Sequence, residues 1–255
     1  MKNDRVTHIP YQNLAPVYDY VMQHVNYDEW ASFLHNVFLR YSPETVNIID
    51  IACGTGNITN EMEKLGYNLT GIDTSESMIA IAEQKAILDG SNNQFIQRDM
   101  RELSGIGCFE GAVCAYDSIN YLLEITDVSD VLTQICYILN PGSLFVFDVC
   151  TERNSTTFFN DLFDEEQGPG FKYKRRSYYD KENRLQYNEF EIQFDGDDTN
   201  YHEQHVQKIY SLKDIETQII TDNFTILGVF DEFTFNSGSE DSNRVHYVIR
   251  TPNNK

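Results

Sequence analysis

A buried strand followed by a glycine-rich turn constrains this chain more than any other segment. Residues 46–51 form an apolar run, and Gly54 and Gly56 follow it closely. Glycine adopts left-handed backbone conformations without steric cost, so the pair predicts a sharp turn from the strand into a helix. The next apolar run ends on Asp73, which lies 23 residues beyond Asp50. A doubly wound α/β fold places at about this point the acid that holds a ribose, so the pattern indicates a nucleoside ligand.

The turn lacks the features that bind phosphate groups. Dinucleotide-binding folds use G-x-G-x-x-G, whereas Thr59 stands here in place of the third glycine. The G-K-[ST] ending of a P-loop is absent, and no basic residue lies between Ile48 and Glu63. We therefore expect the nucleoside ligand to carry no phosphate.

Four short motifs follow one another between residues 46 and 149. They are the acidic and glycine-containing run at residues 50–56, the run at residues 71–78, Asp99 with Met100 after a short strand, and the turn at residues 139–145. In this order they resemble the class I S-adenosylmethionine-dependent methyltransferases of the small-molecule type. A single one of these motifs would be weak evidence, but four in the right order are hard to meet by chance.

The resemblance implies S-adenosyl-L-methionine as the cofactor and S-adenosyl-L-homocysteine as its product. It places Asp73 on the ribose and Asp99 on the adenine amino group, and lets the backbone at Gly54 and Gly56 approach the methionine moiety. The cofactor-binding residues that we predict are Tyr11, Tyr18, Ala52, Cys53, Gly54, Gly56, Asp73, Thr74, Met78, Asp99, Met100, Tyr116 and Asp117. Simpler interpretations are an ordinary strand-to-helix turn at the glycines and a helix cap at Asp73.

The segment at residues 114–121 closes the fourth strand and is the best candidate for substrate contact. We predict Asp117 and Tyr18 as catalytic residues. Asp117 could hold the ammonium group of the cofactor, orient a substrate amine or accept a proton; the alternative is an acid that only stabilises its own loop. A general base is needed only if the nucleophile must lose a proton. His202 or His205 could serve as that base, although an isolated surface histidine is the simpler interpretation.

Charge and composition restrict the partners. The 255 residues carry 19 basic and 40 acidic side chains, and the formal net charge of −21 disfavours a nucleic acid substrate. The basic cluster at residues 172–176 alternates along a predicted strand and is interpreted as a solvated face. No run of 18 apolar residues and no signal peptide is evident, so we expect a cytoplasmic protein without a membrane partner. Five cysteines without C-x-x-C spacing indicate reduced thiols and no metal site.

The alternation of strands and helices predicts an α/β fold. The resemblance implies a Rossmann-like, doubly wound, seven-stranded sheet, mostly parallel with an antiparallel last strand. We expect N-terminal cap helices in residues 1–45, the methyltransferase α/β core in residues 46–150 and 211–255, and an antiparallel β insertion in residues 151–210, which would be a lid or a dimer surface. Helices are expected at residues 11–25, 28–41, 57–65, 75–89, 127–139 and 211–222, and later strands at residues 170–179, 185–194, 201–210, 225–235 and 244–250.

These features together predict a methyltransferase that transfers a methyl group to nitrogen or oxygen of a small molecule by in-line displacement. A homodimer is compatible with the sequence. Two other functions stay open at this point. A non-catalytic protein that senses or sequesters the cofactor would show the same motifs, and a nicotinamide-dependent oxidoreductase would share the architecture but needs the missing third glycine.

Overall fold

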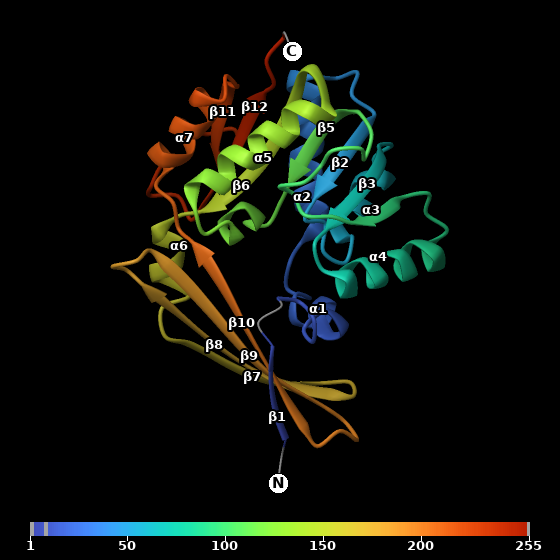
Figure 1. Cartoon of the computed structure of the whole chain (residues 1–255), viewed down its shortest axis with the longest axis vertical. Helices are drawn as coiled ribbons and strands as arrows, with labels where there is room; N and C mark the ends of the chain where they lie inside the picture. The colour runs from blue at the N-terminus through green and yellow to red at the C-terminus, as the bar shows by residue number, and fades with distance from the viewer. Residues whose placement is uncertain (1–2, 8–9, 254–255) are drawn as a thin grey trace.

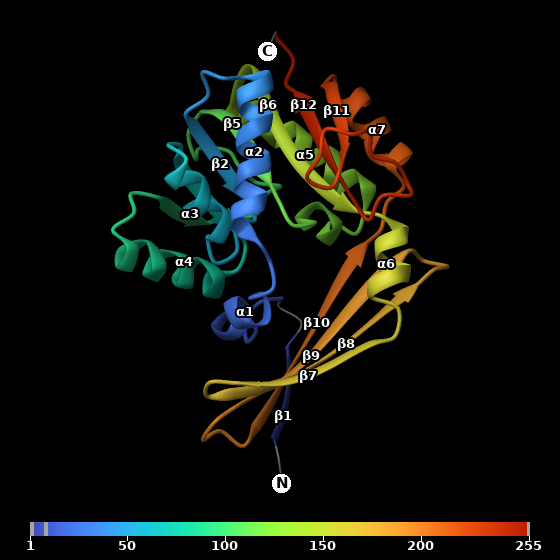
Figure 2. The ribbon, with the colours of Figure 1, turned by 180° about the vertical axis from the view of Figure 1, so that it is seen from behind.

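A computed structural model describes residues 3–7 and 10–253 of the chain. Two sheets dominate it: a seven-stranded sheet of strand order β11-β12-β6-β5-β2-β3-β4 and a five-stranded sheet of order β1-β10-β9-β8-β7. Figures 1 and 2 show the second sheet beyond the carboxyl ends of the central strands of the first, with helix α1 between the two. The fold thereby encloses the edge at which α/β proteins bind ligands.

The seven-stranded sheet confirms the expected core. Its strands are β2 (Asn47–Ile51), β3 (Asn68–Asp73), β4 (Gln94–Gln97), β5 (Phe109–Cys114), β6 (Leu139–Cys150), β11 (Thr225–Asp231) and β12 (Arg244–Arg250). The neighbouring pairs from β4 to β6 are all parallel, whereas β12 runs antiparallel between β6 and β11. The turn expected at residues 139–145 is instead the start of β6, in which Gly142 takes a left-handed backbone with φ +79°.

Helices cover both faces of this sheet, as a doubly wound fold requires. They are α2 (Tyr27–Tyr41), α3 (Asn57–Lys64), α4 (Glu76–Asp89), α5 (Ile125–Ile138) and α7 (Leu212–Thr221), with the short 3₁₀ helix η1 (Ser118–Tyr121) after β5. Ile49 belongs to the apolar cluster that contains buried residues of α5 and α7, while Ile48 belongs to the cluster that contains those of α2 and α3. No helix within residues 3–7 and 10–253 is long and apolar enough to cross a bilayer.

The second sheet contains more than the three strands that we expected. It comprises β7 (Leu162–Gly168), β8 (Phe171–Asp180), β9 (Leu185–Phe194) and β10 (Thr199–Lys208), all antiparallel, and β1 (Asn3–Thr7), which pairs parallel to β10. The sequence prediction missed β7 because its acidic residues do not alternate with apolar ones. It also missed β1 and the helix α6 (Glu152–Phe158) that follows β6.

Helix α1 (Ala15–Val21) is shorter than the helix predicted at residues 11–25. Pro16 occupies its first turn, and Tyr11 has a left-handed backbone with φ 63°, which interrupts any helix before that point. Buried side chains of α1, among them Val17, pack against Phe190 and Ile192 of β9. This packing holds α1 against the second sheet.

Candidate active site

Two polar turns at the ends of β2 and β3 are joined by a hydrogen bond. Ala52, Gly54 and Gly56 all have left-handed φ values, of 58°, 56° and 78°, so the chain after β2 turns sharply before α3. The carboxylate of Asp73 accepts hydrogen bonds from the backbone N–H of Gly54 at 2.9 Å and of Ser75 at 2.8 Å. Asp73 is buried, and this burial raises the pKa of its carboxyl group although the N–H donors oppose the shift.

The two glycines of the turn have different environments. A side chain at Gly54 would meet no atom within 4 Å, so this backbone borders open space. A Cβ at Gly56 would lie 2.9 Å from the Phe95 ring and 3.3 Å from Ala82. Gly56 therefore lets the start of α3 lie close to Phe95 of β4 and Ala82 of α4, while Gly54 leaves room for a ligand.

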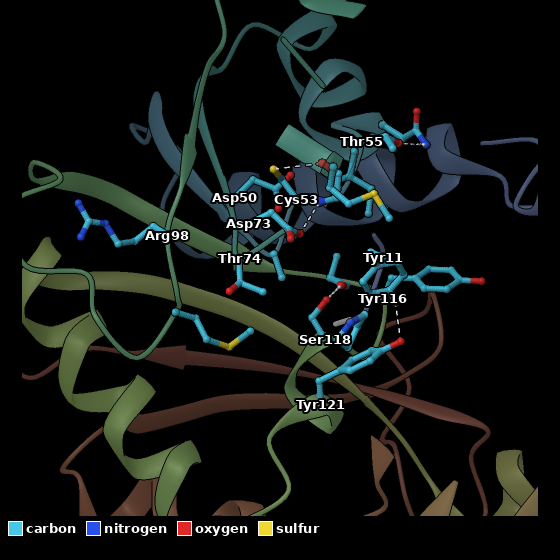
Figure 3. Close-up of a pocket in the computed structure, with 18 of the residues that line it drawn as sticks. Tyr11, Asp50, Cys53, Thr55, Asp73, Thr74, Arg98, Tyr116, Ser118 and Tyr121 are labelled. Atoms are coloured by element: carbon cyan, nitrogen blue, oxygen red, sulfur yellow. Dashed lines mark hydrogen bonds between the residues drawn. The ribbon is translucent and has the colours of Figure 1, made fainter. Parts of the chain in front are cut away.

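A cavity of about 340 Å³, which we call the larger cavity, opens beside this turn. Figure 3 shows Tyr11, Tyr116 and Tyr121 on the side opposite Asp50, Cys53 and Asp73. All the predicted cofactor-binding residues except Gly56 and Asp117 line it, namely Tyr11, Tyr18, Ala52, Cys53, Gly54, Asp73, Thr74, Met78, Asp99, Met100 and Tyr116. The structure therefore brings together motifs that lie far apart in the sequence.

Asp99 and Arg101 at the rim of the larger cavity pair with each other. Asp99 is partly exposed and forms a 2.7 Å ion pair with Arg101, whose hydrogen bond lowers the pKa of the Asp99 carboxyl group. Arg101 also lies 3.5 Å from Asp127. Figure 3 shows Arg98 pointing away from the other labelled side chains. Of the two arginines that line this cavity, Arg101 is thus engaged by carboxylates, and Arg98 is turned away from the glycine turn.

These surroundings fit the cofactor that the resemblance implies. Open space at Gly54 lets a ligand approach the backbone, while Met78 and Met100 add apolar surface beside the polar Asp73 and Thr74. A nucleoside without phosphates needs this mixture of an apolar surface for the base and polar groups for the ribose.

Two acids that were not among the predicted site residues also support this site. Asp50 is buried at the end of β2 and accepts a 2.5 Å hydrogen bond from Thr59; burial raises the pKa of its carboxyl group to about 7, and the nearby Asp73 adds to the shift. Asp19 of α1 accepts a 2.6 Å hydrogen bond from Thr55 and pairs with Lys85 at 2.8 Å. Asp19 thus links α1 to the glycine turn by a hydrogen bond.

A second cavity of about 110 Å³, which we call the smaller cavity, lies between the two sheets. Its wall takes Arg175, Asn188 and Phe190 from β8 and β9, besides residues of α1. Four tyrosines line both cavities: Tyr11, Tyr18, Tyr116 and Tyr121. The two cavities are therefore neighbours that share one aromatic wall.

Asp117 lies in the smaller cavity, with its carboxylate engaged by other side chains. It forms a 2.7 Å ion pair with Arg244 and accepts a hydrogen bond from Gln207. Arg244 also pairs with Asp148, which accepts the backbone N–H of Asp117 at 2.8 Å. Burial raises the pKa of both carboxyl groups, and Arg244 opposes that shift. The geometry thus presents Asp117 as part of a buried charge cluster, and its predicted contact with the cofactor stays a prediction.

A chain of hydrogen bonds leads from the shared tyrosine wall into the second sheet. The hydroxyl groups of Tyr11 and Tyr121 are 2.5 Å apart, and Tyr121 lies 3.2 Å from Nδ1 of His205. The other ring nitrogen of His205 lies 3.2 Å from the buried carboxylate of Glu203. Glu203 also accepts backbone N–H groups, including that of Leu14 at 3.1 Å. His205 thus lies on a connected path, whereas His202 lines neither cavity.

Apart from His205, the polar side chains that β8, β9 and β10 contribute to the smaller cavity were not predicted. One signal for them exists, because Gln186 and Asn188 occupy alternate positions of β9, and Glu203, His205 and Gln207 do so in β10. All five are buried. Alternate positions of a strand share one face, so this spacing indicates a polar face. The sequence alone does not show that this polar face is buried, because that depends on which face of the sheet the rest of the protein covers.

The comparisons with known proteins agree with this geometry. Residues 48–142 match a family model described as a methyltransferase domain. A protein of Geobacillus sp. (strain WCH70), named as a methyltransferase without a stated substrate, is 31% identical over 244 residues, which are 94% of this chain and 99% of that protein. A dTDP-3-amino-3,4,6-trideoxy-alpha-D-glucopyranose N,N-dimethyltransferase of Streptomyces venezuelae is 28% identical over 137 residues, 52% of this chain and 56% of that protein.

Solved structures share the fold. A crystal structure of an S-adenosylmethionine-dependent methyltransferase from Clostridium acetobutylicum ATCC 824 superposes with a TM-score of 0.81 at 21% identity, covering 95% of this chain and 99% of that chain. The similarity in sequence to the Geobacillus protein spans nearly the whole of both chains. With the motifs at the larger cavity, these findings show that the chain belongs to the class I S-adenosylmethionine-dependent methyltransferases.

Proposed function

We propose that this methyltransferase transfers the methyl group to a nitrogen or oxygen atom of a small molecule bound in the smaller cavity. One observation carries the proposal: Tyr11, Tyr18, Tyr116 and Tyr121 line both cavities. A reaction between two bound molecules needs adjoining sites with a common boundary, because orientation of the reacting atoms is the main source of rate enhancement. The aromatic wall supplies that boundary.

The cofactor is held, in this proposal, by the larger cavity. Asp73 holds the ribose, Asp99 accepts a hydrogen bond from the adenine amino group, and the backbone at Gly54 approaches the methionine moiety. When bound, S-adenosylmethionine supplies an electrophilic methyl group on a positively charged sulfur atom. Tyrosine ring faces stabilise positive charge, so the shared wall suits this group.

The hydrogen-bonded chain from Tyr11 to Glu203 can receive a proton from the acceptor. A hydroxyl group loses a proton as it is methylated, and an ammonium group must lose one before its nitrogen can attack, so a positioned base makes either reaction easier. Tyr121 can take up that proton as it passes its own proton to Nδ1 of His205, which lies 3.2 Å away. Glu203, 3.2 Å from the other ring nitrogen, stabilises the protonated ring.

The Streptomyces venezuelae relative supports an acceptor of low molecular mass, because its name states an amino sugar nucleotide that it methylates on nitrogen. The acidic surface also supports it, since a net charge of −21 disfavours binding to nucleic acid. Tyr18, predicted to be catalytic, contributes to the same wall, with its ring 5.8 Å from that of Tyr11.

A labelled-methyl assay tests the proposal. The protein is incubated with S-adenosylmethionine labelled on the methyl group and with pools of small amines, phenols and alcohols, and we expect label in a product of low molecular mass. Label in protein or RNA alone, or in no product, would contradict the proposal.

Variants locate the reaction once an acceptor is found. Tyr121→Phe removes the hydroxyl group beside His205, and kcat is expected to fall by about tenfold or more, the lower range for loss of a general base. Tyr137→Phe removes a hydroxyl group from an exposed position of α5 and should leave kcat unchanged. Equal kcat values for the two variants would remove Tyr121 from the mechanism.

A further inference from the structure

We propose that the methyl acceptor carries an oxyanion, a carboxylate or a phosphate, and that Arg175 binds this group in the smaller cavity. The inference rests on the proposed function, because it assigns the substrate class of the same site. It is carried by the contacts of Arg175, a side chain that the sequence analysis grouped with a solvated basic cluster.

The guanidinium group of Arg175 is held in place by uncharged groups. Its Nε donates to Ser177 Oγ at 3.1 Å and its Nη2 donates to Asn188 Oδ1 at 2.9 Å. The rings of Phe159 and Phe190 lie 5.1 and 5.6 Å from its central carbon. Within the described part of the chain, Nη1 has no hydrogen-bond partner. Arg175 is therefore positioned before any ligand arrives, with donor capacity left over.

No carboxylate among the described residues lies within ion-pairing distance of Arg175. Asp164 stands opposite it in the register of β7 and β8, but its carboxylate accepts the hydroxyl group of Tyr173 at 3.1 Å. Asp117 and Asp148 pair with Arg244 instead. The positive charge of Arg175 is thus not balanced by a direct contact.

The other carboxylate close to this cavity is also engaged. Glu203 accepts backbone N–H groups of Tyr11 and Leu14, at 2.9 and 3.1 Å, and lies beside His205. An acid that already accepts several hydrogen bonds has little capacity left for a distant cation. A ligand oxyanion is therefore the missing partner that the cavity can accommodate.

A guanidinium group removed from water without a counterion costs free energy. Burial accordingly lowers the pKa of the half-buried Arg175, although neighbouring tyrosines and, at longer range, Asp164 oppose the shift. An oxyanion would offset this cost, and the planar fork of an arginine suits carboxylate and phosphate oxygens in particular. Proteins that keep such a group beside a cavity commonly do so for a ligand.

The neighbouring basic residues of β8 differ from Arg175 in exposure and in the face of the strand on which they lie. Lys172, Lys174 and Arg176 are exposed, and Lys174 lies 3.9 Å from Glu165 on the adjacent strand. Arg175 points to the opposite face of the strand and lines the smaller cavity. Since the shared tyrosine wall bounds the same cavity, an oxyanion on Arg175 would direct the rest of the acceptor toward the larger cavity.

Binding of simple probes tests the inference without any methyl transfer. Benzoate, phenyl phosphate and the neutral benzamide are titrated by NMR into the protein saturated with S-adenosylhomocysteine. We expect benzoate or phenyl phosphate to bind about tenfold or more tightly than benzamide, as expected for a hydrogen-bonded charge pair. The tighter of the two anions identifies the oxyanion as carboxylate or phosphate.

Two substitutions on one strand provide the matched control. Arg175→Gln should abolish the preference for the anions, whereas Arg176→Gln removes the same charge from the exposed face and should keep it. Arg175→Lys keeps the charge without the planar fork and should retain part of the preference. The melting temperature and circular dichroism of each variant establish that it is folded.

Equal binding of benzamide and the anions to the parent protein would overturn the inference, and so would an undiminished preference in folded Arg175→Gln. Either result leaves the labelled-methyl assay unaffected. Conversely, anion binding that depends on Arg175 in a protein without methyl transfer to small molecules would contradict the proposed function alone. The two failures are thus distinguishable.

Discussion

The walls of the two cavities are stabilised in different ways. The larger cavity is bounded by backbone turns at the ends of parallel strands, where Ala52 and Gly54 take left-handed conformations. The smaller cavity depends on hydrogen bonds between side chains distant in sequence, such as the ion pair of Asp117 with Arg244 and the bond of Asp117 with Gln207. We infer that removing one side chain from the wall of the larger cavity has a local effect. Removing one from the wall of the smaller cavity leaves several hydrogen-bonding partners unpaired.

The largest effect is expected for Arg244→Met. Asp117 and Asp148 are buried and both pair with this guanidinium group, so its loss leaves two acids without a cation. Breaking such a buried cluster costs about 3–5 kcal/mol. The free energy of unfolding, measured by urea titration, should fall by that amount.

An exposed ion pair and a second substitution serve as controls for Arg244. Lys174→Met disrupts the exposed pair with Glu165 and should cost about 0–1 kcal/mol. Adding Asp148→Asn to Arg244→Met removes one uncompensated charge and should recover part of the lost stability. If Arg244→Met were as mild as Lys174→Met, the smaller cavity would not depend on its charge cluster.

The next effect separates the two glycines of the larger cavity. Gly56→Ala should lower the free energy of unfolding by about 2–4 kcal/mol, because it adds left-handed strain and a contact with Phe95. Gly54→Ala adds only the left-handed strain of about 1–2 kcal/mol. Its methyl group enters open space beside the cavity, so it should weaken binding of S-adenosylhomocysteine in calorimetry. Equal losses of stability, with unchanged affinity for Gly54→Ala, would show that both glycines serve packing alone.

The difference between the two cavity walls also explains which parts of the site the sequence could predict. The larger cavity follows from short local signals, since Gly54, Asp73 and Asp99 each lie at or just after the end of a strand, and parallel strands end at one edge of a sheet. The smaller cavity does not, because Arg175 looks like its basic neighbours until the partner strands show which face is covered. Strand β1 was missed for a related reason, as its pairing with β10 joins residues nearly two hundred positions apart.

A pH-dependent effect of intermediate size is expected from Asp50. Its pKa of about 7 lies above the ordinary value of 3.8, so the folded protein binds more protons than the unfolded chain between these values. The free energy of unfolding therefore falls as the pH rises from about 4 to about 7, with a contribution of about 3 kcal/mol between pH 5 and pH 8.

Asp50→Asn removes this titration. The stability of the variant relative to the parent protein should rise across the same interval, as measured by urea titrations at pH 5, 6, 7 and 8. Glu61→Gln changes an acid of the exposed Lys64 pair and should give a constant difference. A constant difference for Asp50→Asn as well would mean that its carboxyl group ionises at an ordinary pKa.

The smallest effect is expected for Arg101→Gln at the rim of the larger cavity. The pair of Arg101 with Asp99 is partly exposed, so its loss should change the free energy of unfolding by about 0–1 kcal/mol, and less at high salt. The pKa of Asp99 should rise, because Arg101 is the main cause of its low value.

At pH 7 Asp99 remains an acceptor for the adenine amino group. The affinity for S-adenosylhomocysteine should then change less than about threefold, whereas Asp99→Ala should lower it by about tenfold. A large loss of affinity in Arg101→Gln would show that the larger cavity, too, depends on a side-chain network, and the difference between the two walls would disappear.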